Sequence, residues 1–103
     1  MNAPNIHIAL FRLGRIVSTP NALGRLAQED ILTAIQHHQA GDWGDLCDED
    51  RQANDRSLTH GGRLFSVYNS GSGTRFWVIT EADRSITNVK LHISDQMLTL
   101  HKC

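Results

Sequence analysis

The chain has 103 residues, of which 40% are hydrophobic and 20% charged, and its net charge at pH 7 is −1. This length fits one domain, so we expect a single domain over residues 1–103, with no apolar run near the ~20 residues of a membrane span and no basic-then-apolar opening typical of a signal peptide. The near-neutral charge also argues against direct binding to nucleic acid.

The first elements follow from apolar spacing and from residues that start helices. Apolar residues at alternating positions predict a first strand over 6–17. Thr19 followed by Pro20 is a typical helix start, because Thr19 can cap the helix and Pro20 needs no hydrogen-bond acceptor there. We therefore expect a short helical turn over 20–26 before the first long helix, which the pattern predicts over 28–39.

A second long helix follows a tight loop. Gly41 ends the first one, and either Asp45 or Asp48 is expected to cap the next, which runs to about residue 60 and stops at two glycines. Its composition is polar, with few apolar residues. Such a helix should lie on the surface and pack along a narrow strip.

The rest of the chain changes to the period of strands. Strands are predicted over 63–69, 74–81 and 86–93, with a hairpin loop over 70–73 and a last short strand over 97–101. The order β-α-α-β-β-β indicates an α+β fold: an antiparallel meander sheet that the first strand joins, with two helices on one face. The other face should be partly open.

The strand over 74–81 is apolar on both sides. Trp77 and Ile79 should face one way, and Phe76 and Val78 the other. This pattern predicts a central strand that is covered on both faces, or a strand with one face that binds a partner.

Acidic residues gather in the region between the two long helices and in the second of them. A structural interpretation is helix capping and a solvated helix face that Arg51 and Arg56 partly neutralise. A functional interpretation is a surface for a basic partner, since the calcium-loop pattern of EF-hands is absent. The candidate partner-binding residues are Asp42, Trp43, Asp45, Asp48, Glu49, Asp50 and Asp55.

Other reactive residues lack the spacing that chemistry requires. His37 and His38 point about 100° apart on a helix, so we interpret them as partners of the helix end and surface rings rather than metal ligands. Cys47 and Cys103 form no CxxC pair, and reduced thiols are expected. No serine lies in a G-x-S-x-G turn. We expect no metal, no cofactor and no catalysis.

The predicted order of elements resembles the RelE/ParE toxin superfamily over about residues 6–93. Ribonuclease members of that superfamily use Arg, Lys, Tyr or His on the last strands. The resemblance therefore implies, as an alternative function, a toxin-like ribonuclease. Its candidate residues would be Arg63, Tyr68, Arg75, Lys90 and His92. Such toxins are typically basic, whereas this chain is near neutral, and phosphate contacts dominate binding to RNA.

Three motifs are more specific. HxxGDWG over 38–44, ED-x-x-x-N over 49–54 and WxITEADRS over 77–85 are similar to a family of short, uncharacterised proteins from plasmids and integrative elements of Gram-negative bacteria. The resemblance covers about residues 15–89. It implies a bacterial, cytoplasmic protein carried by a mobile genetic element, and it implies no catalytic residues.

These observations lead to an expected function. The chain should be a non-catalytic accessory protein that binds and blocks or modulates a host nucleic-acid-processing or defence complex, as anti-CRISPR proteins do. The contact would run through the acidic helix over 45–58 and the GDWG loop, where carboxylates facing a basic channel compete with phosphate. A further alternative is a homodimeric interaction module paired through an open sheet edge.

Overall fold

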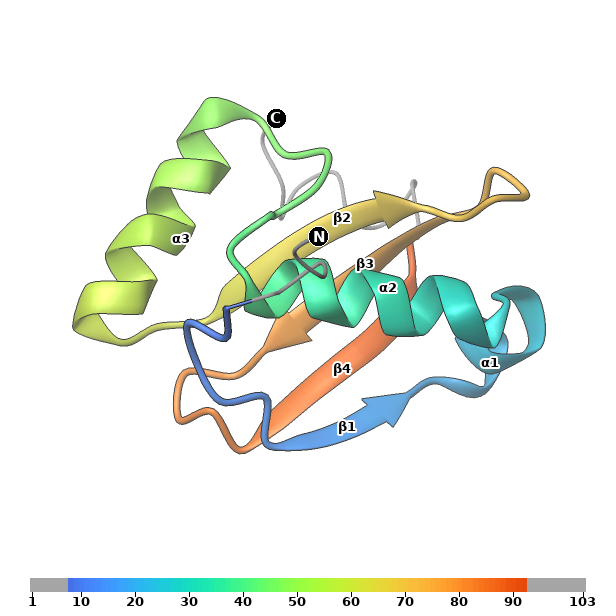
Figure 1. The fold of residues 1–103 in the computed structure, drawn as a ribbon, viewed down its shortest axis with the longest axis horizontal. Helices are drawn as coiled ribbons and strands as arrows, with labels where there is room; N and C mark the ends of the chain where they lie inside the picture. Colours follow the sequence, from blue (N-terminus) through green and yellow to red (C-terminus); the bar gives the residue numbers. More distant parts are fainter. Residues whose placement is uncertain (1–7, 93–103) are drawn as a thin grey trace, which may run out of the picture.

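The computed structural model describes residues 8–92 as a four-stranded sheet with three helices (Figure 1). The α+β class and the order β-α-α-β-β-β are confirmed, with the predicted short turn as an additional helix, α1. The elements are β1 (Arg15–Ser18), α1 (Pro20–Arg25), α2 (Gln28–Gln39), α3 (Asp48–His60), β2 (Leu64–Asn69), β3 (Arg75–Thr80) and β4 (Ile86–Leu91).

The sheet has the strand order β1-β4-β3-β2. β2, β3 and β4 form the predicted antiparallel meander. β1 joins the sheet parallel to β4, so the sheet is mixed. β3 is central, as the apolar residues on both of its sides predicted. The strand expected over 97–101 lies outside the described residues.

The first strand is much shorter than predicted, because β1 covers only Arg15–Ser18. The segment before it crosses the end of α2 instead: the Leu10 N–H donates to the Gln39 carbonyl at 2.9 Å, and the Gln39 side chain donates to the Phe11 carbonyl at 2.8 Å. Ile8 and Leu10 are 70% and 50% exposed, so the alternating apolar residues here do not form the buried face of a strand.

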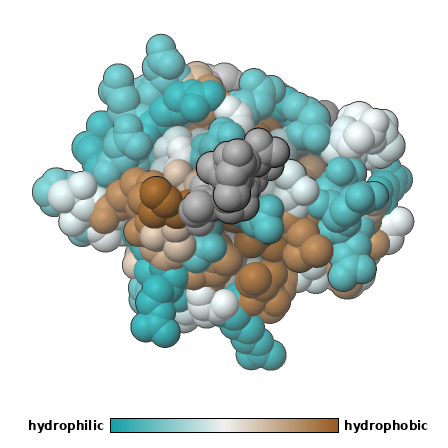
Figure 2. Space-filling view, in the orientation of Figure 1, coloured by the Kyte–Doolittle hydropathy of each residue, from teal (hydrophilic) through white to brown (hydrophobic). Residues whose placement is uncertain are grey.

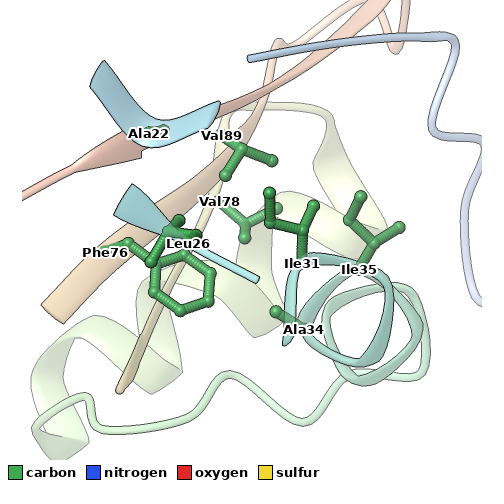
Figure 3. Packing of buried hydrophobic residues seen from close by; sticks show 8 residues of the cluster. All are labelled: Ala22, Leu26, Ile31, Ala34, Ile35, Phe76, Val78 and Val89. Atoms are coloured by element: carbon green, nitrogen blue, oxygen red, sulfur yellow. The ribbon is translucent and has the colours of Figure 1, made fainter. Parts of the chain in front are cut away.

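One face of the sheet is covered by α1 and α2, and this is the larger core (Figure 3). The Thr19 hydroxyl accepts from the Ala22 N–H at 3.2 Å, with Pro20 at the first helical position, so the predicted helix start is confirmed. The buried side chains of this core are Ala22, Leu26, Ile31, Ala34, Ile35, Phe76, Val78 and Val89.

α3 lies beside β2 rather than over the face that α2 covers (Figure 1). The second helix on that face is α1, which differs from the expectation for the two long helices. A second core on the other side of the sheet contains Trp77 and Val67, with Leu58 of α3 and Ile79 packed against it. The predicted division of β3 into two apolar faces is therefore confirmed.

The outer edge of β2 is closed by side-chain and loop contacts. The Asn54 side chain donates to the Phe65 carbonyl at 2.7 Å and accepts from the Phe65 N–H at 3.1 Å. Val67 pairs with the preceding loop, since its N–H donates to the Trp43 carbonyl and its carbonyl accepts from the Asp45 N–H. These contacts satisfy backbone groups that an edge strand normally leaves open.

Arg84 ties the β3–β4 turn to the end of α3. Its guanidinium donates to the carbonyls of Ser57 at 3.1 Å and Gly62 at 2.5 Å, and also to two carbonyls of its own turn. Its charge lies 5.7 Å from the centre of the Phe11 ring. Arg84 has a φ of 61°, a conformation that costs energy outside glycine and here places the side chain for these contacts.

Candidate functional site

The predicted partner-binding residues lie along the loop after α2 and along α3. Five of their side chains are exposed, and we call these five residues the acidic surface: Asp42, Asp45, Asp48, Glu49 and Asp55. Asp50 is half-buried in the first turn of α3. The acidic first turn of α3 is favourable, because the amino end of a helix carries partial positive charge.

Trp43 is buried, with only 3% of its surface exposed, so the prediction that it contacts a partner is wrong. Its ring stacks on Phe11 at 6.2 Å between centroids and meets the His38 ring edge-on at 5.7 Å. In the sequence, Trp43 lies in the GDWG loop among the acidic residues. The loop instead turns this side chain into the core.

The loop that carries Asp42 and Asp45 is held in place by backbone contacts. Gly44 has a φ of 77° and lies against the Val67 carbonyl, where a Cβ atom would come within 2.0 Å. Arg51 reaches back from α3 and donates to the carbonyls of Leu46 at 3.1 Å and Gly44 at 2.7 Å. The loop therefore has a fixed conformation, which lowers the entropy cost of presenting its carboxylates.

Asp42 is fixed by contacts to its carboxylate and to its backbone carbonyl. One oxygen of its carboxylate lies 2.9 Å from His37 Nδ1, and the other accepts from the Gly44 N–H at 3.3 Å. The Tyr68 hydroxyl donates to the Asp42 backbone carbonyl at 2.5 Å. Burial raises the pKa of Tyr68, and the nearby Asp42 charge raises it further, against the effect of a hydrogen bond to Ser66. Tyr68 therefore stays neutral and keeps this bond.

The remaining acidic residues differ in how they are paired. Asp45 forms a salt bridge with Arg75 at 2.7 Å, and because both side chains are substantially exposed the pair contributes about 0–1 kcal/mol. Asp48, Glu49 and Asp55 form no salt bridge within residues 8–92. Their charges are thus open to a partner. The expected capping by Asp45 or Asp48 is wrong, because α3 begins after Cys47 without a side-chain cap.

His38 is the polar residue that the sequence interpretation missed. It is fully buried, so the interpretation as a surface ring is wrong for His38, whereas His37 is partly exposed. Its Nδ1 lies 2.5 Å from the Ser66 hydroxyl and its Nε2 lies 2.9 Å from the Thr80 hydroxyl. The chain continues to Thr87 at 2.7 Å and ends where Thr87 donates to the Leu13 carbonyl.

The direction of these hydrogen bonds follows from their end. Thr87 donates to Leu13, so Thr87 accepts from Thr80, and Thr80 in turn accepts from His38. His38 is then the neutral tautomer with its proton on Nε2, and Ser66 donates to Nδ1. Burial lowers the pKa of His38 to about 3, with a smaller contribution from the Arg84 charge. Ser66 is itself fully buried, which places this Ser–His pair out of reach of a substrate.

The residues implied by the toxin resemblance do not form one cluster. Arg63 pairs with Glu81 at 3.5 Å, at the end of the sheet where β2 begins and β3 ends. Arg75 and Lys90 share the sheet face of Trp77, whose ring meets that of His92 at 5.3 Å. Tyr68 lies on the opposite face, packed against Phe76. Within residues 8–92, the fold brings Arg75, Lys90 and His92 to the part of the sheet around Trp77, where the Arg75 carbonyl accepts from the His92 N–H at 3.1 Å, and it places Arg63 and Tyr68 elsewhere.

An apolar groove lies between β1 and the helices α1 and α2. It encloses about 640 Å³, and Figure 2 shows apolar surface in this region. Its exposed apolar side chains include Leu23, Leu32 and Ile16, which are 64%, 53% and 49% exposed. The groove adjoins the edge of β1, which is the only sheet edge that the described residues leave open.

Three further observations concern metals, thiols and membrane-spanning helices. Among residues 8–92, no three His, Cys, Asp or Glu side chains are grouped so that they could hold a metal ion. Cys47 is disulfide-bonded in the structure, so the expectation of a reduced thiol is wrong at this position. No helix in the described part of the chain is long and apolar enough to cross a membrane.

Comparison of the chain with protein-family models, with curated proteins and with solved structures found no match.

Proposed function

We propose that this chain is a non-catalytic accessory protein of mobile genetic elements that binds a host nucleic-acid-processing or defence complex and blocks or modulates it, in the manner of an anti-CRISPR protein. The contact is made by the acidic surface. The observation that carries the proposal is that Asp48, Glu49 and Asp55 are exposed and form no salt bridge within residues 8–92, on a helix fixed to β2 by Asn54.

The mechanism is electrostatic and steric. A protein that handles nucleic acid presents a basic channel to phosphate groups, and a fixed row of carboxylates competes for the same charges. Gly44 and Arg51 already fix the loop that carries Asp42 and Asp45, so binding a partner costs little conformational entropy there. The affinity should fall as salt increases, since exposed charges are screened beyond about 10 Å at 0.1 M salt.

The experiment is affinity purification of the tagged chain from a Gram-negative bacterium, with identification of co-eluting proteins by mass spectrometry. The purified partner is then titrated with the wild-type chain and with the triple variant Asp48→Lys, Glu49→Lys and Asp55→Lys. We expect the variant to bind at least about tenfold more weakly, which corresponds to about 1.4 kcal/mol. Short nucleic acid should displace the wild-type chain.

The matched control is Glu29→Lys, which reverses an exposed charge in the first turn of α2, outside the acidic surface. It should bind like the wild-type chain. Equal affinity of the triple variant and the wild-type chain would contradict the proposal, as would a partner that nucleic acid does not displace.

A second candidate function is a homodimeric module, which the open edge of β1 favours. In the parallel ladder, Arg15 and Thr19 direct their N–H groups toward β4, so Ile16 and Ser18 direct their backbone groups away from the sheet. Those groups have no hydrogen-bond partner within residues 8–92. Since the β2 edge is closed, each chain offers one edge, and two chains pairing through it would form a closed dimer.

Light scattering over a range of micromolar concentrations tests this candidate. Ile16→Lys should abolish a dimer, because Ile16 lies on the open edge and is 49% exposed. Leu10→Lys is the control, since Leu10 is equally exposed and lies outside β1. A monomer at all concentrations would rule out the dimer without affecting the proposal for the acidic surface.

A further inference from the structure

A pocket of about 410 Å³ lies where the end of β4 meets α1. It is lined by Thr19, Asn21, Arg25, Lys90, Leu91 and His92. Two of these residues, Arg25 and Lys90, carry basic side chains, and a third is a histidine. None of the described residues that line the pocket is acidic, so the pocket is an electropositive concavity on a chain whose net charge is −1.

The basic side chains of this pocket, Arg25 and Lys90, do not hold other parts of the chain within residues 8–92. Arg51 and Arg84 hold backbone carbonyls, while Arg63 and Arg75 pair with carboxylates. Arg25 and Lys90 form no salt bridge and no side-chain hydrogen bond with described residues. The other basic side chains without such partners, Arg12, Arg15 and Arg56, do not line this pocket and are exposed on the surface.

We propose that this pocket binds the phosphate group of a small ligand, in the size class of a nucleoside monophosphate. The planar fork of Arg25 and the ammonium of Lys90 suit phosphate oxygens, and both would make charge-assisted hydrogen bonds. The Thr19 hydroxyl accepts from the Ala22 N–H and keeps its own proton for a ligand. The Asn21 amide adds two donors, and Leu91 supplies an apolar wall.

The volume supports a small ligand over a polymer. Small-molecule sites are concave and span about 300–1,000 Å³, which includes this pocket. A nucleic-acid strand would instead require a track of phosphate contacts along the surface. The pocket contains no residue of the acidic surface. Phosphate binding at the pocket and partner binding at the acidic surface can therefore be tested independently.

The test is calorimetric titration of the full chain with inorganic phosphate, adenosine monophosphate and a short single-stranded RNA. We expect saturable binding of adenosine monophosphate, and a loss of at least about tenfold in affinity for Arg25→Gln combined with Lys90→Gln. The matched control combines Arg12→Gln with Arg56→Gln, which removes the same charge from exposed positions outside the pocket. This control should retain the wild-type affinity, and circular dichroism should show both variants folded.

The three probes separate the sources of phosphate. Comparable binding of inorganic phosphate and adenosine monophosphate supports a site for the phosphate group alone, and tighter binding of the nucleotide supports a nucleotide site. Absence of saturable binding by both small probes would overturn the proposal. An equal loss of affinity in the pocket variant and the control, or binding of RNA only, would overturn it as well, because either result indicates attraction of a polyanion to the surface charge.

Discussion

His38 donates from Nε2 to the Thr80 hydroxyl at 2.9 Å, between α2 and the middle of the sheet. This bond is one link in a chain that runs from Ser66 to the Leu13 carbonyl. The chain connects α2 to β2, β3 and β4, and to the segment before β1. The Ser66 hydroxyl proton has His38 Nδ1 as its acceptor only while the imidazole is neutral.

The first prediction is a loss of stability as the solution becomes acidic. The pKa of His38 is lowered to about 3 in the folded chain, against 6.5 in an unfolded one, so the unfolded state binds more protons in this range. The free energy of unfolding is not reduced by His38 above pH 6.5. As the pH falls from 6.5 to 3, protonation of His38 in the unfolded state lowers it by about 1.4 kcal/mol per pH unit. Urea unfolding at pH 7 and pH 5.5 measures the difference.

Two variants isolate the contribution of His38. His38→Gln should be less stable at pH 7, because it leaves buried hydroxyls without partners, and should lose the dependence between pH 7 and 5.5. His60→Gln changes an exposed histidine at the end of α3 and should keep the wild-type slope. An unchanged slope in His38→Gln would contradict the assignment.

The second prediction compares two glycines. Gly44→Ala should destabilise the chain by more than about 2 kcal/mol, because Gly44 has a φ of 77° and the added Cβ would lie 2.0 Å from the Val67 carbonyl oxygen. Gly24→Ala places the same methyl group in α1 with no atom within 4 Å, and should stabilise the chain by roughly 0.5–1 kcal/mol. Thermal unfolding of both variants gives the comparison, and similar melting temperatures would refute it.

The third prediction concerns the closed edge of β2. Asn54→Ala removes both hydrogen bonds to the Phe65 backbone and should cost roughly 2 kcal/mol, since each bond contributes about 1 kcal/mol. Hydrogen exchange at the Phe65 amide should become faster in this variant. Gln52→Ala, at an exposed position of the same helix, should change neither quantity. Protection of Phe65 that survives the loss of Asn54 would show that another group covers the edge.

The fourth prediction concerns Arg84. Arg84→Lys keeps the charge but loses the planar fork that reaches the Ser57 and Gly62 carbonyls together. We expect a loss of roughly 2 kcal/mol, and faster hydrogen exchange in the last turn of α3. Arg56→Lys on the exposed side of α3 is the control. If Arg84→Lys is as stable as the wild-type chain, the carbonyl contacts contribute little.

The sequence was informative where local chemistry decides the structure. Thr19 with Pro20, the polar composition of α3 and the two apolar faces of β3 are local signals, and each corresponds to an element in the structure. The surroundings of His38 could not be predicted, because its partners Ser66 and Thr80 come from strands far along the chain. Spacing within α2 indicates only that His38 lies near a helix end.

The candidate site, too, could be predicted from the sequence only where local composition decides the structure. Clustered carboxylates indicated an acidic surface, and most of them are exposed. Trp43 and Asp50 depart from it, because the loop pairs with Val67 and turns Trp43 inward while Asp50 is half-buried. The basic pocket could not be predicted from the sequence, because Arg25 and Lys90 are far apart in the chain. They line one pocket only because α1 packs against β4.

The parallel pairing of β1 with β4 has a consequence for how the chain is made. Arg15 aligns with Ile86, so the first described strand finds its neighbour only after the last described strand has been synthesised. Until then β1 has neither of its flanks covered, and α1 lacks the strand on which it rests. The described sheet therefore cannot be completed before β4 is made, and its longest-range strand pairing is the last to become possible during synthesis.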